Sequence, residues 1–557
     1  MSGAPASLTR HDSLAAAIEA LGAAHGPLLT LHLGLSDECL DGPTLRERAL
    51  HWARAFHALG VARGDRVVLL LPTSNAFVQG FLGVQLLGAV AVPLACPMTF
   101  GAPTRYLEIL ANVVDDAEPS CIVTTERLRA AMASVTRFTT TRASIVTPAE
   151  IEAAHAAPFA LPSVAPRELA LLQYTSGTTG QPKGVAVSNR ALVSNAACIR
   201  DALAIDENDI GVSWLPMFHD MGLIGVFVTA ICHPYPMHLM SPDSFVMQPR
   251  RWLERISRVR GTVSAAPNFA YELCARRGVE PESIRLDSWR AALSGAEPVR
   301  EGTLDRFAAC YATSGFSRDR FMPVYGLAEA TLAVTFPPVG AAPKTQHVEC
   351  ESLSPGQRVR ASIKASASSV LSVGRPVRGT EVRIANERGS AIEARVVGEI
   401  CVRGPGLMDG YFRREEATAD ALRDGWLHTG DLGYVDDGVL FVVGRAKEMI
   451  VKSGRNVYPA DIESVVEQVA GVLSAAAFGV ANAKSGTEDL IVVCESRVRT
   501  EALREALAAE VKAELLATTG VRADSVCVWP VSAIPRTTSG KIRHAECAMR
   551  WTEGRAS

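Results

Sequence analysis

Strands and helices alternate along the chain from about residue 65, and this alternation limits the possible folds most strongly. Val67-Val68-Leu69-Leu70-Leu71 is a continuous apolar run, which is typical of a strand that helices cover on both faces. We expect strand, helix, strand, helix and strand in turn at 66–71, 75–87, 90–94, 105–116 and 121–124. The sequence therefore predicts a layered α/β fold.

A loop rich in glycine and hydroxyl side chains lies between two further predicted strands, Leu169–Tyr174 and Val185–Val187. Glycines allow backbone N–H groups to approach an anion closely, and hydroxyls and a lysine add donors and positive charge. The common nucleotide-binding loop opens a helix and places Ser or Thr after its lysine, whereas Gly184 follows Lys183 here. We predict a different phosphate-binding loop, with a flexible surface turn as the alternative. Its binding residues would be Thr175, Ser176, Gly177, Thr178, Thr179, Gly180 and Lys183.

Six more motifs follow the loop in a fixed order. They are W-L-P-M-F-H-D-M-G-L-I-G from Trp214, L-S-G-A-E-P from Leu293, Y-G-L-A-E-A-T from Tyr325, G-W-L-H-T-G-D from Gly425, G-R-A-K-E from Gly444 and P-R-T-T-S-G-K from Pro535. Together with the loop, these motifs and their order resemble those of the adenylate-forming superfamily. The resemblance covers nearly the whole chain. Within it the sequence is most similar to the fatty acyl-AMP ligases, through the strings at His219–Gly225, Ala266–Tyr271 and Tyr325–Thr331. A long polar segment, Phe336–Val373, corresponds to an insertion that limits domain motion in that branch; an ordinary variable loop is the alternative.

The resemblance implies two domains, an N-terminal adenylation domain at 1–444 and a small mobile α+β domain at 445–557. The hinge would lie near Lys447. In the small domain we expect helices at 460–469 and 500–516 and strands at 475–480, 489–494 and 526–529. Residues 136–168 have weak periodicity, and we expect them to wind over the surface before the phosphate loop.

The resemblance also assigns a nucleotide site. Gly295, Ala296 and Glu297 would line the adenine slot, Tyr325 would stack on the base with Gly326 beside it, Asp431 would accept the ribose hydroxyls, and Arg445 would lie near the ribose and phosphate. Asp431 as a turn residue and Glu297 as a helix-start carboxylate are the alternatives.

Three residues are expected to act in the chemistry itself. Glu329 would bind Mg²⁺, which prefers carboxylate and phosphate oxygens. Lys541 would reach from the small domain to the α-phosphate, and His219 would act as a gate beside the acyl carboxylate. A solvated surface charge is the alternative for Lys541. The alternative for His219 is a structural role at a strand end, where its ring forms a hydrogen bond with a neighbouring backbone group.

These assignments predict an ATP-dependent enzyme that converts a fatty acid to acyl-AMP with release of pyrophosphate. The acyl group would then pass to the phosphopantetheine thiol of a separate acyl carrier protein, as in lipid, polyketide or nonribosomal peptide biosynthesis. We expect the acyl wall at Trp214–Val228 and Ala265–Leu273. An acyl-CoA or aryl-CoA ligase and a non-catalytic nucleotide-binding protein are the alternatives.

Composition excludes other classes of function. The net charge is only -3, which gives no basic footprint for nucleic acid. The most apolar stretch, Gly80–Cys96, is too short to span a bilayer of ~30 Å, and residues 1–14 have no signal-peptide pattern, so we expect a cytoplasmic enzyme without a transmembrane segment. The 12 cysteines have no metal-ligand spacing and are expected to be reduced. The oligomeric state stays open.

Overall fold

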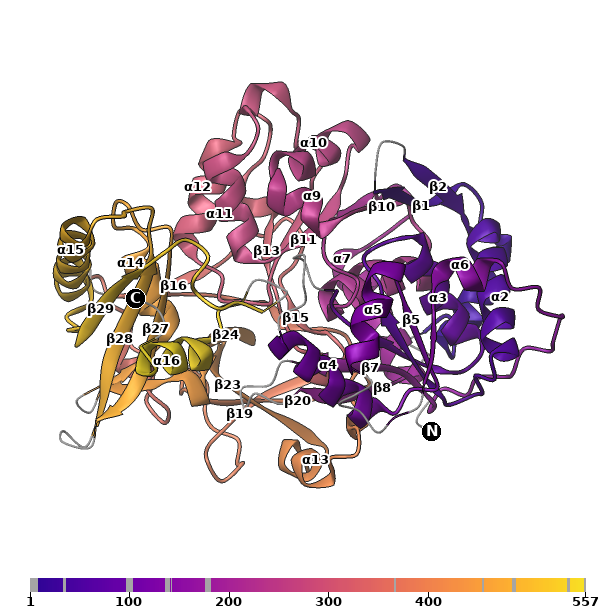
Figure 1. Cartoon of the computed structure of the whole chain (residues 1–557). Coiled ribbons are helices and arrows are strands. Elements are labelled where there is room, and N and C mark those ends of the chain that lie inside the picture. Colours follow the sequence, from indigo (N-terminus) through magenta and orange to yellow (C-terminus); the bar gives the residue numbers. More distant parts are fainter. Residues whose placement is uncertain are drawn as a thin grey trace, which may run out of the picture.

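The computed structural model describes residues 9–33, 37–96, 104–135, 141, 143–175, 182–364, 367–452, 455–482, 487–537 and 541–554. Two seven-stranded sheets, a smaller five-stranded sheet and a separate C-terminal α+β unit make up the main architecture (Figure 1). The predicted α/β class is therefore confirmed.

The first sheet contains the strands that the apolar runs predict. From edge to edge its strands are β21 (Gly410–Tyr411), β8 (Lys183–Ser188), β7 (Leu169–Thr175), β4 (Val90–Pro93), β3 (Arg66–Leu70), β5 (Cys121–Thr124) and β6 (Ser144–Val146). Alternate residues of β3 face opposite cores. Val67 and Leu69 pack in the core that includes α3 (Asn75–Leu86), whereas Val68 and Leu70 pack in the core that includes α4 (Thr104–Ala117). A strand covered on both faces must be apolar at every position, which explains the continuous run.

The second sheet supplies most of the loops around the cleft. Its order is β13 (Phe321–Pro323), β12 (Ala291–Ser294), β11 (Val263–Ala266), β9 (Gly211–Ser213), β10 (Met237–Met240), β1 (Pro27–His32) and β2 (Glu38–Asp41). Two helices, α11 (Asn268–Arg277) and α12 (Glu301–Cys310), follow β11 and β12 and cover one end of it. The strands β9 to β13 pair in parallel, so the loops that leave their carboxyl ends gather at one edge.

The third sheet lies nearest the small domain. It pairs β19 (Glu381–Ala385), β20 (Gly398–Arg403), β23 (Trp426–Asp436) and β22 (Leu422–Arg423), with β24 (Val439–Arg445) on β23. Residues of the predicted insertion pack beside this sheet as an antiparallel pair, β16 (Thr345–Val348) and β17 (Ser368–Leu371). Within its described residues, the Phe336–Val373 segment is thus ordered structure rather than an ordinary loop.

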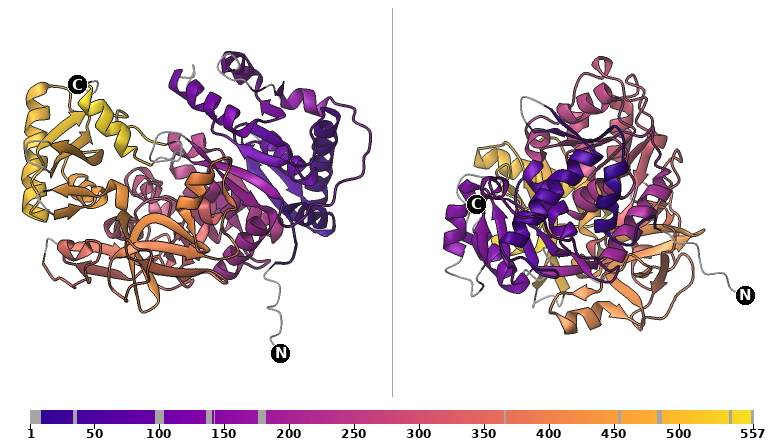
Figure 2. Two further views of the ribbon diagram at one scale, coloured as in Figure 1. Left: turned by 90° about the horizontal axis from the view of Figure 1, so that it is seen from below. Right: turned by 90° about the vertical axis from the view of Figure 1, so that its right-hand side faces the viewer.

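The C-terminal unit has a hydrophobic core of its own, which includes Ile462, Leu490 and Val511. A hairpin of β25 (Ile450–Lys452) and β26 (Arg455–Val457) leads into β27 (Ser474–Asn482), β28 (Thr487–Glu495), β29 (Ser525–Trp529), α14 (Pro459–Val466), α15 (Glu501–Thr519) and α16 (His544–Thr552). Figure 2 shows this unit, in yellow, against the middle of the chain and away from the indigo N-terminal part. The predicted boundary at 444/445 stays a prediction, and β24 runs one residue past it, to Arg445.

Two local predictions were wrong. Residues 136–168 contain β6 and a short helix, α6 (Pro148–Glu152). A capping box between Thr147 and Glu150 stabilises the start of this helix. Three strand residues on a sheet edge give too short an apolar pattern to recognise. His219 does not lie at a strand end, because β9 ends at Ser213; it lies just before a π-helix, η2 (Met221–Val228).

Candidate active site

A cleft between the large domain and the C-terminal unit, about 3250 Å³ in volume, contains most of the predicted site residues. Its lining includes Thr175, Lys183, His219, Ala296, Glu297, Tyr325, Gly326, Glu329, Asp431, Arg445 and Lys541. Gly295 does not line it. Ser176, Gly177, Thr178, Thr179 and Gly180 lie outside the described residues.

The phosphate-binding loop leaves the sheet between two antiparallel strands. Thr175 ends β7 and is the direct partner of Lys183, which begins β8. This arrangement confirms that no helix follows the lysine in this loop, unlike in the common nucleotide-binding loop. The predicted loop is therefore closed by a strand pair that fixes Lys183 at the rim of the cleft.

Lys183 and Glu329 are linked through Tyr411, which sequence reasoning did not identify. The Tyr411 hydroxyl donates to Glu329 Oε1 at 2.9 Å, and Lys183 Nζ lies 4.8 Å from the centre of the same ring. Tyr411 is placed there because β21 pairs with β8, a contact between segments far apart in the sequence. An aromatic face attracts a cation, so Tyr411 positions both charges.

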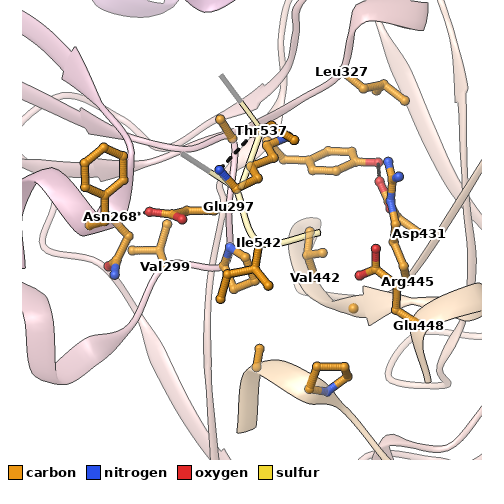
Figure 3. Close-up of a pocket in the computed structure, with 18 of the residues that line it drawn as sticks. Asn268, Glu297, Val299, Leu327, Asp431, Val442, Arg445, Glu448, Thr537 and Ile542 are labelled. Atoms are coloured by element: carbon orange, nitrogen blue, oxygen red, sulfur yellow. Dashed lines mark hydrogen bonds and ion pairs between the residues drawn. The ribbon is translucent and has the colours of Figure 1, made fainter. Parts of the chain in front are cut away.

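Three of the predicted nucleoside residues form a hydrogen-bonded cluster, in which Tyr325 and Asp431 are buried and Arg445 is exposed. Tyr325 donates its hydroxyl to Asp431 Oδ2 at 2.7 Å, and Arg445 Nε donates to Asp431 Oδ1 at 2.8 Å (Figure 3). Asp431 and Arg445 are direct partners on β23 and β24. Burial and, after it, the nearby Asp431 charge hold the pKa of Tyr325 well above its ordinary value. The Tyr325 hydroxyl thus remains a hydrogen-bond donor, and Asp431 is more than a turn residue.

Two glycines of the predicted site are required by close packing. A Cβ at Gly326 would lie 1.9 Å from the Leu332 carbonyl oxygen, and a Cβ at Gly295 would lie 2.9 Å from Val324. Ala296 adopts a left-handed backbone with φ +67. Gly295 and Ala296 thereby shape the loop after β12, while Gly326 packs closely against Leu332.

Glu297 also holds this loop in place. Its Oε1 accepts a hydrogen bond from the Phe269 backbone N–H at 2.6 Å, in the first turn of α11. Burial raises the pKa of Glu297 above its ordinary value. The alternative of a helix-start carboxylate describes this contact, and a role beside adenine stays a prediction.

His219 and Asp220 form a pair at the start of η2. His219 Nδ1 lies 2.7 Å from Asp220 Oδ1, and Asp220 also accepts the Met221 N–H at 2.7 Å. Burial opposes the charged form of Asp220, but His219 and then Lys541 lower its pKa below the ordinary value. Lys541 lines the same cleft as Asp220 and Glu297, and its positive charge favours the charged form of both carboxylates.

The C-terminal segment that carries Lys541 enters the cleft. Thr537 and Ile542 lie in Figure 3 between Glu297 on one side and Asp431 with Arg445 on the other. The Lys541 N–H donates to Thr537 Oγ1 at 3.0 Å, and the Thr537 N–H donates to the Lys541 carbonyl at 2.7 Å. The described ends of this motif, Thr537 and Lys541, are thus fixed to each other. Thr538, Ser539 and Gly540 lie outside the described residues.

One group with metal-ligand chemistry lies near Asp431 and was not predicted from the sequence. Glu399, Cys401 and His428 have ligand atoms within 4.8 Å of one another, and among the described residues no other such group is found. The Glu399 carboxylate already has hydrogen-bond partners. It accepts the Gly430 N–H at 3.0 Å and lies 2.7 Å from His428 Nδ1. Glu399 thereby supports the part of β23 that presents Asp431.

The apolar part of the cleft differs from the predicted acyl wall. Phe218, Gly225 and Phe269 line it as expected, but Trp214 is buried and stacks on Phe245 with ring centres 3.8 Å apart. The cavity extends further than the two predicted segments, to Ile199, Leu203, Val212, Tyr235, Met237 and Val263. Ile199 and Leu203 share one helix, α7 (Asn189–Leu203), but the other residues come from distant parts of the chain, so no local sequence pattern could have identified them together.

Comparisons with known proteins agree with this geometry. The family model described as "AMP-binding enzyme" matches residues 42–412. The chain belongs to the AMP-binding enzyme family. Among its relatives, the medium-chain-fatty-acid–[acyl-carrier-protein] ligase JamA of Moorena producens is 34% identical, over 89% of this chain and 87% of that protein.

Two solved structures are similar over nearly the full length of this family member. One comes from a study of fatty acyl-adenylate ligases from E. coli and L. pneumophila, with 34% identity, a TM-score of 0.90 and coverage of 99% of this chain and 100% of that chain. The other is a fatty acyl-adenylate ligase from L. pneumophila in complex with acyl adenylate and pyrophosphate, with 31% identity, a TM-score of 0.75 and coverage of 98% and 97%. No helix in the described part of the chain is both long and apolar enough for a membrane span.

Proposed function

We propose that this protein activates a fatty acid with ATP, forms acyl-AMP and releases pyrophosphate, and then transfers the acyl group to the thiol of a separate acyl carrier protein. The observation that carries the proposal is the shared cleft. It combines the Tyr325–Asp431–Arg445 cluster, Lys183 with Glu329, and Lys541. The similarity to fatty acyl-adenylate ligases and to a ligase named for an acyl carrier protein supports the same reaction.

Activation is needed because a carboxylate has no good leaving group. Attack of a carboxylate oxygen on the α-phosphorus of ATP expels pyrophosphate and leaves a mixed anhydride. Negative charge gathers on phosphate oxygens in the transition state, and fixed positive groups stabilise it. Lys183 would hold the departing phosphates, and Lys541 would stabilise charge at the α-phosphate.

The nucleoside end of ATP would bind at Asp431. Its carboxylate oxygens would accept the ribose hydroxyls while Tyr325 and Arg445 keep the carboxylate oriented. The Tyr325 ring would support the base. The loop Gly295–Glu297 would form the far wall of the adenine slot.

Glu329 fits a magnesium site that phosphate completes. It is a carboxylate at the cleft, oriented by Tyr411 and near Lys183, and Mg²⁺ is usually held by one or two carboxylates together with substrate phosphates. When bound there, Mg²⁺ would neutralise charge on the phosphate oxygens. Glu329 would hold it, and Lys183 would bind the same phosphate chain from the other side.

The fatty acid would lie with its carboxylate beside His219 and its chain in the apolar extension of the cleft. Walls of Gly225, Val226 and Val263 leave room for a flexible alkyl chain. The pair of His219 with Asp220 would gate the entrance, as predicted. A location in the cytoplasm stays a prediction of the sequence.

Coenzyme A is the less favoured acceptor, because the Phe336–Val373 segment contacts the small domain directly. The Tyr458 hydroxyl donates to the Leu353 carbonyl at 3.0 Å, and the Ser368 hydroxyl donates to Asp461 at 3.0 Å. These contacts would restrain a rotation of the small domain about the 3₁₀ turn η7 (Ala446–Glu448), where we place the hinge. A restrained rotation would disfavour the coenzyme A step.

Product analysis by mass spectrometry tests the proposal. The protein is incubated with ATP, a mixture of fatty acids, and either coenzyme A or a phosphopantetheinylated carrier protein. We expect acyl-AMP in both reactions, a carrier thioester in the second and little acyl-CoA in the first. Acyl-CoA formed as fast as ATP is consumed would instead identify an acyl-CoA ligase, and no fatty-acid-dependent product would identify a non-catalytic protein.

A further inference from the structure

Arg300 connects the large domain to the small one. Its side chain forms an ion pair with Glu467, and its second terminal nitrogen lies 3.6 Å from Glu463 Oε2. Glu463 lies on α14, and Glu467 follows its end. The Glu463 side chain is only 5% exposed and the Arg300 side chain 25%, so the three charges meet inside the domain interface. A charge in such a place is stabilised only by its partners.

On the small-domain side, both carboxylates accept hydrogen bonds from β27, and Glu463 also contacts His544 beside the Lys541 segment. Glu463 Oε1 accepts the Ala477 N–H at 3.1 Å and lies 2.6 Å from His544 Nε2. His544 begins α16, three residues after Lys541 in the sequence. Glu467 Oε1 accepts the Ala475 N–H at 3.1 Å. Glu463 thus links Arg300 to His544 and, through it, to the segment that carries Lys541.

On the large-domain side, Arg300 ends the loop that begins at Gly295. Its backbone N–H donates to Asn268 Oδ1 at 3.0 Å, and Glu297 accepts the Phe269 N–H. Both contacts anchor the loop to the first turn of α11. Arg300 therefore has a fixed backbone from which its side chain reaches across the interface.

We propose that Arg300 is a positioning residue that keeps the small domain in the arrangement in which Lys541 reaches the reacting phosphate. The inference rests on the proposed function, because it assigns Lys541 to the adenylation step. Without the guanidinium, Glu463 and Glu467 would lose their cross-domain partner inside the interface, and separation of the domains would let water solvate both carboxylates. Arg300 would also connect the predicted adenine loop to the Lys541 segment. The same loop would then help to bind the base and to position Lys541.

The test compares Arg300→Gln with a matched control, Arg318→Gln. Arg318 also reaches two carboxylates, Glu301 and Asp305, but both lie in the large domain. Two reactions are measured: exchange of labelled pyrophosphate into ATP with dodecanoic acid, and acyl transfer from presynthesised dodecanoyl-AMP to pantetheine. Loss of a charged hydrogen-bonded pair corresponds to roughly a ten- to hundredfold change in rate.

We expect Arg300→Gln to slow the exchange reaction by that factor and to leave acyl transfer within about twofold of the wild type, because transfer from presynthesised acyl-AMP does not need Lys541 at the phosphate. Arg318→Gln should keep both rates. Arg300→Lys should restore part of the exchange rate. The double variant Arg300→Gln with Glu467→Gln should be no slower than Arg300→Gln alone, since the two residues act through each other.

A measurement independent of activity separates this inference from the proposed function. Hydrogen exchange of the amides in 459–467 and 541–554, on the full chain without substrate, should be faster in Arg300→Gln and unchanged in Arg318→Gln. Unchanged hydrogen exchange in Arg300→Gln, or equal loss of both reactions, would overturn the role of Arg300. A wild-type protein with no fatty-acid-dependent exchange of pyrophosphate would overturn the proposed function instead.

Discussion

Tyr325→Phe isolates one hydrogen bond of the proposed nucleoside site. The ring that would support the base is kept, and only the hydroxyl that donates to Asp431 Oδ2 is removed. Both residues are 8% exposed, so water cannot fully replace the donor. A hydrogen bond to a charged group contributes ~1.5–3 kcal/mol, which corresponds to roughly a ten- to 150-fold effect. Because Arg445 still holds the other oxygen, we expect the lower end of that range.

The assay is steady-state adenylation with ATP varied at saturating fatty acid. Tyr325→Phe should lower kcat/KM for ATP about tenfold, while the KM for the fatty acid stays unchanged. Tyr434→Phe is the matched control, because Tyr434 lies on the same strand as Asp431, is buried, and donates to Gln346 at 3.0 Å away from the site. An unchanged kcat/KM for ATP in Tyr325→Phe, or equal losses in the two variants, would refute the role of this hydrogen bond.

Three further predictions follow from single residues. Glu329→Gln should slow adenylation at least tenfold, and added Mg²⁺ should partly restore the rate, as a titration of activity against Mg²⁺ would reveal. Burial raises the pKa of Asp461 from 3.8 to about 6, so its contribution to stability is fully present below pH 3.8 and is lost as pH rises through about 6. Asp461→Asn should therefore raise Tm relative to the wild type at about pH 7.5 but not at about pH 4, and a constant difference across pH would contradict this. Phe307→Ala should lower the free energy of unfolding by ~3–5 kcal/mol in a denaturant titration, because Phe307 is fully buried among Tyr271, Phe316 and Phe321.

Continuous or strongly periodic patterns in the sequence predicted the fold well. The run at Val67–Leu71 predicted a covered strand, and β3 is covered on both faces. A strand on either side of the phosphate loop was also expected from the apolar pattern, and the structure pairs the two strands antiparallel. Short elements escaped detection, as β6 shows, because three residues on a sheet edge carry almost no pattern.

The candidate site was predictable where a motif is local and unpredictable where a contact joins distant segments. Asp431 and Arg445 were identified from short strings, and they prove to be neighbours across two strands. Tyr411 was missed because only the pairing of β21 with β8 brings it to Lys183. Arg300 was missed for the same reason. Its partner Glu467 lies 167 residues further along the chain.

The most direct test of the central claim is exchange of labelled pyrophosphate into ATP, measured with a fatty acid and without coenzyme A or a carrier protein. We predict exchange that depends on the fatty acid in the wild type and is slowed at least a hundredfold in Lys541→Ala, a loss of about 3 kcal/mol of transition-state stabilisation. Exchange that does not require a fatty acid, or that proceeds at the wild-type rate in Lys541→Ala, would contradict adenylation at this cleft.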